Sequence, residues 1–197
     1  MQHTEGAPVS SAPSPLSPCS FVFPSASLRL RGEECLRLLP ALTGAPIRIE
    51  SVPGLRDRRG AVHAGSLLRQ RRIAFNCAPA EFPRIFVHEL FHFVWLRAGN
   101  PLRRSWESRL KAELVAHARG ELGWSAEWRK EALRERDVAD RTRRWREYCC
   151  ESFCDTAAWL FASNESELTL SLKWKEGRNA WFARHIGSEE ARSGISI

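Results

Sequence analysis

The sequence lacks any apolar run of the length that a membrane span needs, and it has no targeting peptide with a basic start and an apolar stretch. We therefore expect a cytoplasmic protein without a membrane-spanning segment. Tyrosine and methionine occur once each, and lysine occurs four times against 26 arginines, so arginine carries the formal net charge of +7. A positive balance of this size favours acidic partners without naming one.

Internal repeats, a glycine-rich phosphate loop and recognised DNA-binding motifs are also missing. Three of the six cysteines, Cys149, Cys150 and Cys154, fall in one expected helix, where adjacent cysteines cannot reach disulfide geometry with one another. We expect free thiols, as in a reducing compartment. Cys150 and Cys154 are soft metal ligands, so a thiolate-bound structural zinc is one interpretation. Ordinary core packing is the other, and we favour it.

The 197 residues, 43% of them hydrophobic, are enough for one domain with a core. Residues 1–20 are rich in serine and proline and predict a disordered arm. We expect a single domain over residues 21–187 and a flexible tail over residues 188–197. From Arg97 to Arg146, 14 basic residues are interleaved with 8 acidic ones, which is typical of a solvated helical face; a nucleic-acid groove is the alternative.

The most informative segment reads His88-Glu89-Leu90-Phe91-His92. Positions i and i+4 of a helix share one face, so the two histidines can direct imidazole nitrogens at one point, as Zn²⁺ requires. Glu89 lies about 100° further round the helix, where it can reach a metal-bound water and act as general base. The flanking residues are apolar, which predicts a buried helix whose ionisable groups need partners such as a metal. Two core histidines beside a surface glutamate are the alternative.

The stretch from Ile85 to Val94 resembles the active-site helix of the zincin metallopeptidases. The metzincin branch is excluded, since this sequence has Trp95 and Ala98 where that branch has glycine and histidine. The resemblance implies an α+β fold with a small, mainly antiparallel sheet, the His-Glu helix, a helix that carries a glutamate, and a helix-rich C-terminal half. It also implies an edge strand that pairs with extended substrate. That place before the metal helix is filled by Ile73, Ala74, Phe75 and Asn76.

The third zinc ligand is expected from a second apolar helix that runs from Tyr148 to Phe161. Glu151 and Asp155 share one face of it, and buried carboxylates demand a cation. Glu151 as ligand and Asp155 as acceptor for a histidine N–H meet this demand. The spacing is similar to that of the glutamate-zincins, particularly the compact bacterial ones. The 58 residues between His92 and Glu151 exceed the usual gap there, so a helical insertion near residues 100–146 is implied.

Two other residues compete with Glu151. Glu113 follows His92 at a distance more usual for glutamate-zincins, and His117 suits a zincin with three histidines. Both fall on an amphipathic helix, where they can lie at a solvated border without a metal, so we favour Glu151. Tyr148, one turn before Glu151, could stabilise the oxyanion of a tetrahedral intermediate. A core position with its hydroxyl at the surface is the alternative.

The sequence thus predicts a zinc-dependent metallopeptidase that acts on a protein or peptide substrate, with Glu89 as base. The opposing class is a binding protein that keeps zinc for stability, or that associates with nucleic acid without turnover. Glu89 argues against that class, because a purely structural site has no use for a base beside its ligands.

Overall fold

The structure is a computed structural model that describes residues 18–57, 60–162, 169–187 and 194–197. Most of the predicted arm over residues 1–20 and the first part of the predicted tail lie outside these residues. Within the described parts of the chain, no helix is long and apolar enough to cross a membrane.

The strands are β1 (Phe21–Val22), β2 (Leu42–Thr43), β3 (Ile47–Ser51), β4 (Arg56–Asp57), β5 (Gly60–Ala61), β6 (Ala64–Leu67), β7 (Arg72–Phe75) and β8 (Ile195–Ser196). The α-helices are α1 (Ala26–Arg37), α2 (Phe82–Arg97), α3 (Asn100–Val115), α4 (Trp124–Glu131), α5 (Glu135–Ala139), α6 (Arg143–Ala162) and α7 (Leu172–His185).

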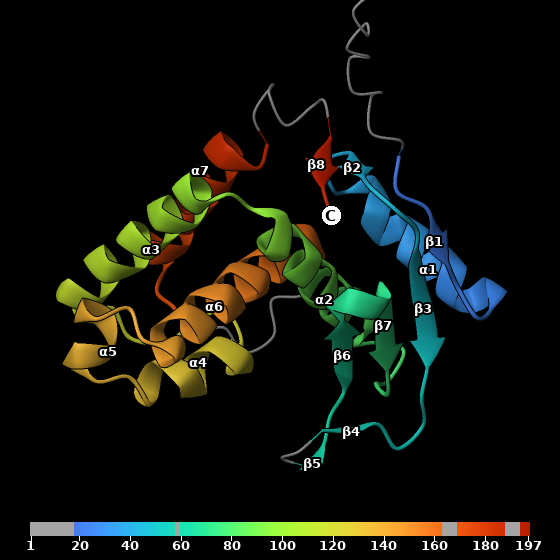
Figure 1. Ribbon diagram of the computed structural model, residues 1–197, viewed down its shortest axis with the longest axis horizontal. Helices are drawn as coiled ribbons and strands as arrows, with labels where there is room; N and C mark the ends of the chain where they lie inside the picture. The colour runs from blue at the N-terminus through green and yellow to red at the C-terminus, as the bar shows by residue number, and fades with distance from the viewer. Residues whose placement is uncertain (1–17, 58–59, 163–168, 188–193) are drawn as a thin grey trace, which may run out of the picture.

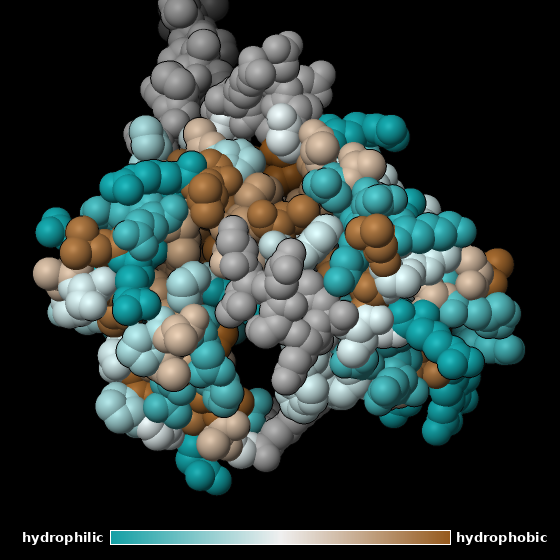
Figure 2. Space-filling view, turned by 180° about the vertical axis from the view of Figure 1, so that it is seen from behind, coloured by the Kyte–Doolittle hydropathy of each residue, from teal (hydrophilic) through white to brown (hydrophobic). Residues whose placement is uncertain are grey.

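The elements form two halves that meet at helix α2 (Figure 1). The sheet and α1 make up one half, and the helices from α3 to α7 make up the other. Helix α2 packs against α1 and β6 on one side and against α6 on the other. On the face seen in Figure 2, hydrophilic residues cover most of both halves, and hydrophobic residues gather between them. The α+β class and the helix-rich second half agree with the sequence prediction.

The main sheet is mixed, so the predicted mainly antiparallel sheet is wrong. Its strand order is β1-β3-β7-β6, in which β1 and β7 both pair with β3 in parallel and only β6 is antiparallel to its neighbour β7. The reason lies in the connections. Helix α1 carries the chain from β1 to β3 in the same direction, and β6 runs back before β7 runs forward again beside β3.

Helix α2 is apolar on most sides because it is covered on two of them. On the sheet side, the Phe75 and Phe82 rings lie with centroids 4.9 Å apart. On the other side, Phe91 packs on Phe153 of α6 with centroids 5.8 Å apart. Burial of these rings, each worth several kcal/mol if deleted, fixes α2 against the sheet through Phe75 and Phe82 and against α6 through Phe91 and Phe153. The prediction of a buried helix is confirmed, and Leu90 within it is fully buried.

The end of the described chain is part of the fold. Strand β8 pairs in parallel with β2, and Ile197 is buried. Arg71 donates a hydrogen bond of 2.8 Å to the Ile197 carbonyl. The prediction of a flexible tail is therefore wrong for residues 195–197, because their apolar side chains and backbone groups find partners on a strand distant in the sequence.

Candidate metal centre

Helix α2 presents His88 and His92 at the border between the core and a cleft. Pro83 fits its first turn, where the missing N–H has no partner within the helix. The apolar side chains described above hold the helix, and the two imidazoles lie on its remaining side. The side chains of His88 and His92 are 12% and 17% exposed. They are thus nearly buried and still open to a small ligand.

Helix α6 brings a carboxylate to the two imidazoles. His88 Nε2 lies 3.3 Å from His92 Nε2 and 3.3 Å from Glu151 Oε2, and His92 Nε2 lies 4.0 Å from the same oxygen. Zinc ligands about 2.0–2.1 Å from a tetrahedral ion lie roughly 3.3–3.4 Å from one another. The three atoms therefore have nearly the spacing of three corners of a zinc site. Two imidazoles and a carboxylate also form a donor set of catalytic zinc sites, which keep a fourth position for water.

The site attracts positive charge. Burial lowers the pKa of His92, but the neighbouring Cys150 sulfur raises it to about 9. Burial likewise lowers the pKa of His88, which Asp155 nevertheless holds well above its usual value. Burial raises the pKa of Glu151, yet the two histidines hold it well below the usual range. Protons on the imidazoles or a metal ion that displaces them can supply the charge that these groups favour.

Asp155 holds the ring of His88 from behind. Its Oδ1 lies 2.8 Å from His88 Nδ1, so Nδ1 carries the proton and Nε2 keeps its lone pair for a metal. Its Oδ2 accepts a 3.0 Å hydrogen bond from the Ala126 N–H. Gly123 is so close that a Cβ added there would lie 2.2 Å from Asp155 Cγ. The Asp155 carboxylate is therefore fixed through both oxygens. It lies so close to the backbone at position 123 that only glycine fits there.

Arg129 and Ser125 of α4 orient Glu151. Arg129 Nη2 lies 3.0 Å from Glu151 Oε1, and the Ser125 hydroxyl donates to Glu151 Oε2. Arg129 also donates to the Ser125 carbonyl at 2.7 Å. These contacts turn Oε2 toward the histidines. Neither residue was predicted from the sequence, because Arg129 stands among interleaved charges and no local pattern links it to a carboxylate on another helix.

Glu89 is held from the side of the sheet. The Ser66 hydroxyl of β6 lies 2.6 Å from Glu89 Oε2 and 2.8 Å from the Glu89 carbonyl oxygen. Glu89 is 9% exposed and lines the same cleft as the two histidines and Glu151. Its carboxylate therefore stands next to the ligand triangle without being part of it. A general base for a metal-bound water must line the same cleft as the metal ligands, and Glu89 meets that condition.

A cleft of about 780 Å³ opens in front of the triangle. Residues of β6 and of the β4–β5 hairpin line it, together with Trp124 and Trp128 of α4. This volume lies within the range of ligand-binding sites, roughly 300–1,000 Å³. The cleft can therefore admit a substrate segment to the three ligand atoms.

The predicted substrate strand is wrong. Ile73, Ala74 and Phe75 belong to β7, which is an internal strand between β3 and β6, and Asn76 follows it with its side-chain oxygen accepting from the Gly54 N–H. The edge strand beside the site is β6 instead. The continuous burial of Ile73 to Phe75 is the physical reason, since an internal strand is covered by neighbours. The unbroken apolar run in the sequence was a usable signal for it.

The predicted catalytic role of Tyr148 is also wrong. Tyr148 is fully buried, and its hydroxyl donates a 2.6 Å hydrogen bond to Glu121 Oε1, away from the cleft. Burial raises the pKa of this phenol well above its usual value. The hydroxyl turns inward because a buried carboxylate is available there as an acceptor.

Neither rival for the third-ligand position lies at the triangle. Glu113 is fully buried and pairs with Arg178 at 2.7 Å, so its predicted place at a solvated border is wrong. His117 is exposed just beyond the end of α3, with a positive φ of 54°. The structure brings together His88, His92, Glu151, Glu89 and Asp155 and leaves both rivals elsewhere.

Comparison of the chain with protein-family models, with curated proteins and with solved structures finds no match.

Replacing Asp155 with asparagine is expected to weaken zinc binding by roughly 10–100-fold, the usual cost of losing a partner behind a metal-binding histidine. The asparagine amide can donate a hydrogen bond from its NH₂ group to His88 Nδ1. The ring proton then sits on Nε2, the nitrogen that should bind zinc. Competition with a chromophoric zinc chelator measures the change. Asp140→Asn, an exposed aspartate between α5 and α6, is the matched control. Equal zinc affinity in Asp155→Asn and the parent would contradict the assigned role.

Proposed function

We propose that this protein is a zinc-dependent metallopeptidase of the glutamate-zincin type, with the ion held by His88, His92 and Glu151. The observation that carries the proposal is the triangle of ligand atoms with edges of 3.3, 3.3 and 4.0 Å. Glu89 stands beside it, and a cleft opens in front of it. A bound zinc ion would polarise a carbonyl and lower the pKa of a water.

The residues of the chain have distinct tasks in peptide hydrolysis. Glu89 takes the proton of the attacking water and delivers it to the leaving amine nitrogen. Ser66 holds the Glu89 carboxylate, and Asp155 keeps His88 in the tautomer that binds metal. Among the described residues no strand pairs with the outer edge of β6, which lines the cleft, so an extended peptide can add there by backbone hydrogen bonds. The substrate is thus a protein or peptide segment in an extended conformation.

Two observations favour this function over a binding protein without turnover. A carboxylate in the place of Glu89, open to the cleft, has no task in a purely structural zinc site. Several arginines between residues 97 and 146 are engaged within the fold, which reduces the charge left for a nucleic acid. Arg141 forms two hydrogen bonds of 2.6 and 2.7 Å with Glu107, and Arg103 donates to the Trp95 and Leu96 carbonyls.

Metal removal is the direct test. The protein purified without chelators is expected to contain about one zinc per chain, as the triangle of His88, His92 and Glu151 implies, and to cleave members of a fluorogenic peptide library. A chelator should abolish cleavage, and one equivalent of Zn²⁺ should restore it. Elemental analysis and the peptide assay check both statements. Zinc without cleavage would favour the binding protein, and absence of any transition metal would contradict the site itself.

A further inference from the structure

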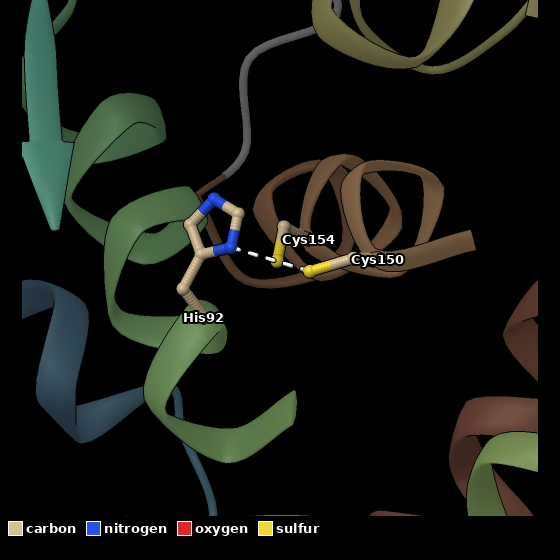
Figure 3. A group of neighbouring side chains, drawn as sticks. All are labelled: His92, Cys150 and Cys154. Atoms are coloured by element: carbon tan, nitrogen blue, oxygen red, sulfur yellow. Dashed lines mark hydrogen bonds between the residues drawn. The ribbon is translucent and has the colours of Figure 1, made fainter. Parts of the chain in front are cut away.

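A second group of ligand atoms lies on the other side of the His92 ring. Cys150 Sγ is 3.4 Å from His92 Nδ1, and Cys154 adds a second thiol, so that the three ligand atoms all lie within 4.8 Å of one another. Both thiols extend from α6 toward the imidazole on α2 (Figure 3). His92 therefore has one nitrogen in each group. Nε2 faces His88 and Glu151, and Nδ1 faces the thiols.

We propose that Cys150, Cys154 and His92 Nδ1 form a second metal site, which takes a thiophilic monovalent ion of the Cu(I) class. We further infer that this site competes with zinc for His92. The competition rests on the proposed zinc site, whereas the thiol site stands on its own three residues.

The donor set decides the class of ion. Two thiolates are soft ligands, and imidazole is a nitrogen donor that suits copper and zinc, so this set selects copper(I) or zinc over magnesium, calcium and manganese. Within the described residues the group offers three donors, and Cys154 is fully buried. Zinc prefers four ligands, whereas two thiolates and one imidazole satisfy a Cu(I) ion. Cys150 and Cys154 stand four residues apart on α6, so the helix itself sets their spacing.

Sharing one imidazole makes the two occupancies antagonistic. Zinc at His92 Nε2 leaves the ring proton on Nδ1, where it points at Cys150. An ion bound at Nδ1 takes that lone pair, so the ring proton moves to Nε2, and the thiol protons leave to solvent as each thiolate binds. No oxidation or reduction is needed, because the ion enters as Cu(I). A neutral imidazole cannot serve both metals at once.

The test is a titration of the reduced, metal-stripped protein with Cu(I) in the presence of a chromophoric Cu(I) chelator. The parent is expected to take one Cu(I) per chain, and the Cys150→Ser, Cys154→Ser double variant is expected to lose this binding. Cys149→Ser is the matched control, because Cys149 is a buried thiol on the same helix whose carbonyl accepts from the Trp106 indole N–H. It should bind like the parent. Equal Cu(I) affinity in the parent and the double variant would overturn the site.

A second titration separates this proposal from the proposed function. His88→Ala removes a ligand of the zinc site only, so it should lower zinc affinity and leave Cu(I) binding intact. Loading the parent with Cu(I) should weaken zinc binding by about 100-fold, near the upper end of couplings between sites, and should have no effect in the double variant. Zinc affinity unchanged by Cu(I) in the parent would refute the competition. If the double variant does not fold, Cys150→Ser alone is measured, and X-ray absorption of the Cu(I)-loaded parent must show both sulfur and nitrogen ligands.

Discussion

Replacing Glu89 with glutamine is expected to lower peptide hydrolysis by about 10²–10⁴-fold, the usual contribution of a general base, while zinc content stays at the parent level. Glutamine has nearly the shape of glutamate and can still accept the hydrogen bond of the Ser66 hydroxyl. It cannot take a proton from water. The loss should therefore appear in kcat, because the residue acts in the transition state and not in binding.

The control for this variant is Glu81→Gln. Glu81 precedes the same helix, and its side chain is 48% exposed, so the same chemical change there should leave hydrolysis unaltered. Steady-state kinetics with one cleaved peptide, together with zinc analysis of all three proteins, completes the comparison. Turnover by Glu89→Gln at the parent rate would show that another group removes the proton.

Arg178→Met is expected to destabilise the fold by about 3–5 kcal/mol, as the removal of one partner from a buried ion pair does. Arg178 is fully buried on α7 and pairs with Glu113 at 2.7 Å and with Glu121 at 2.6 Å, both buried. Burial would raise the pKa of Glu121, but the Arg178 guanidinium keeps it below its usual value. Without the arginine, two carboxylates remain in the core. Their remaining cations are Lys130 near Glu121 and Arg109 near Glu113.

Urea unfolding followed by circular dichroism measures this loss as a lower midpoint at unchanged slope. The control is Arg143→Met, because Arg143 is 86% exposed and pairs with Glu147 one turn away, a contact worth less than about 0.5 kcal/mol. Adding Glu113→Gln and Glu121→Gln to Arg178→Met should recover part of the loss by removing the unpaired charges. If Arg178→Met has the midpoint of the parent, the network does not hold α7 in place.

The parts of the fold that the sequence predicted are those governed by local pattern. Helix α2 could be placed because an apolar run follows Pro83, and the spacing of His88 and His92 on one face follows from helical geometry alone. The same argument puts Glu151 and Asp155 on one face of α6. The packing of rings such as Phe91 on Phe153 places α2 beside α6, so that the histidines of one helix meet the carboxylates of the other. This packing exists only in the folded chain and could not be predicted from local pattern.

The predictions that failed depended on partners far away in the sequence. Tyr148 has a hydroxyl suited to an oxyanion, yet it turns to Glu121, 27 residues earlier. The amphipathic pattern of α3 predicted that Glu113 lies at a solvated border, but in the folded chain it is buried and pairs with Arg178 of α7. The strand beside the site was misplaced because Gly65 weakens the sequence signal of β6, although in the described part of the chain β6, and not β7, is the edge strand of the sheet. Local pattern cannot reveal which of several polar groups will be buried together.

The separation of His92 from Glu151 has a consequence for the nascent chain. Synthesis proceeds at about 5–20 residues per second, so roughly 3–12 s pass between the appearance of the two residues. During that interval α2 has strand β7 to pack on but lacks α6, and Phe91 has no Phe153 to cover it. An uncovered apolar helix with two histidines and a glutamate is then exposed to solvent, to chaperones and to free metal ions. Until Glu151 is made, the nascent chain therefore holds His88, Glu89 and His92 of the site without the helix that completes it.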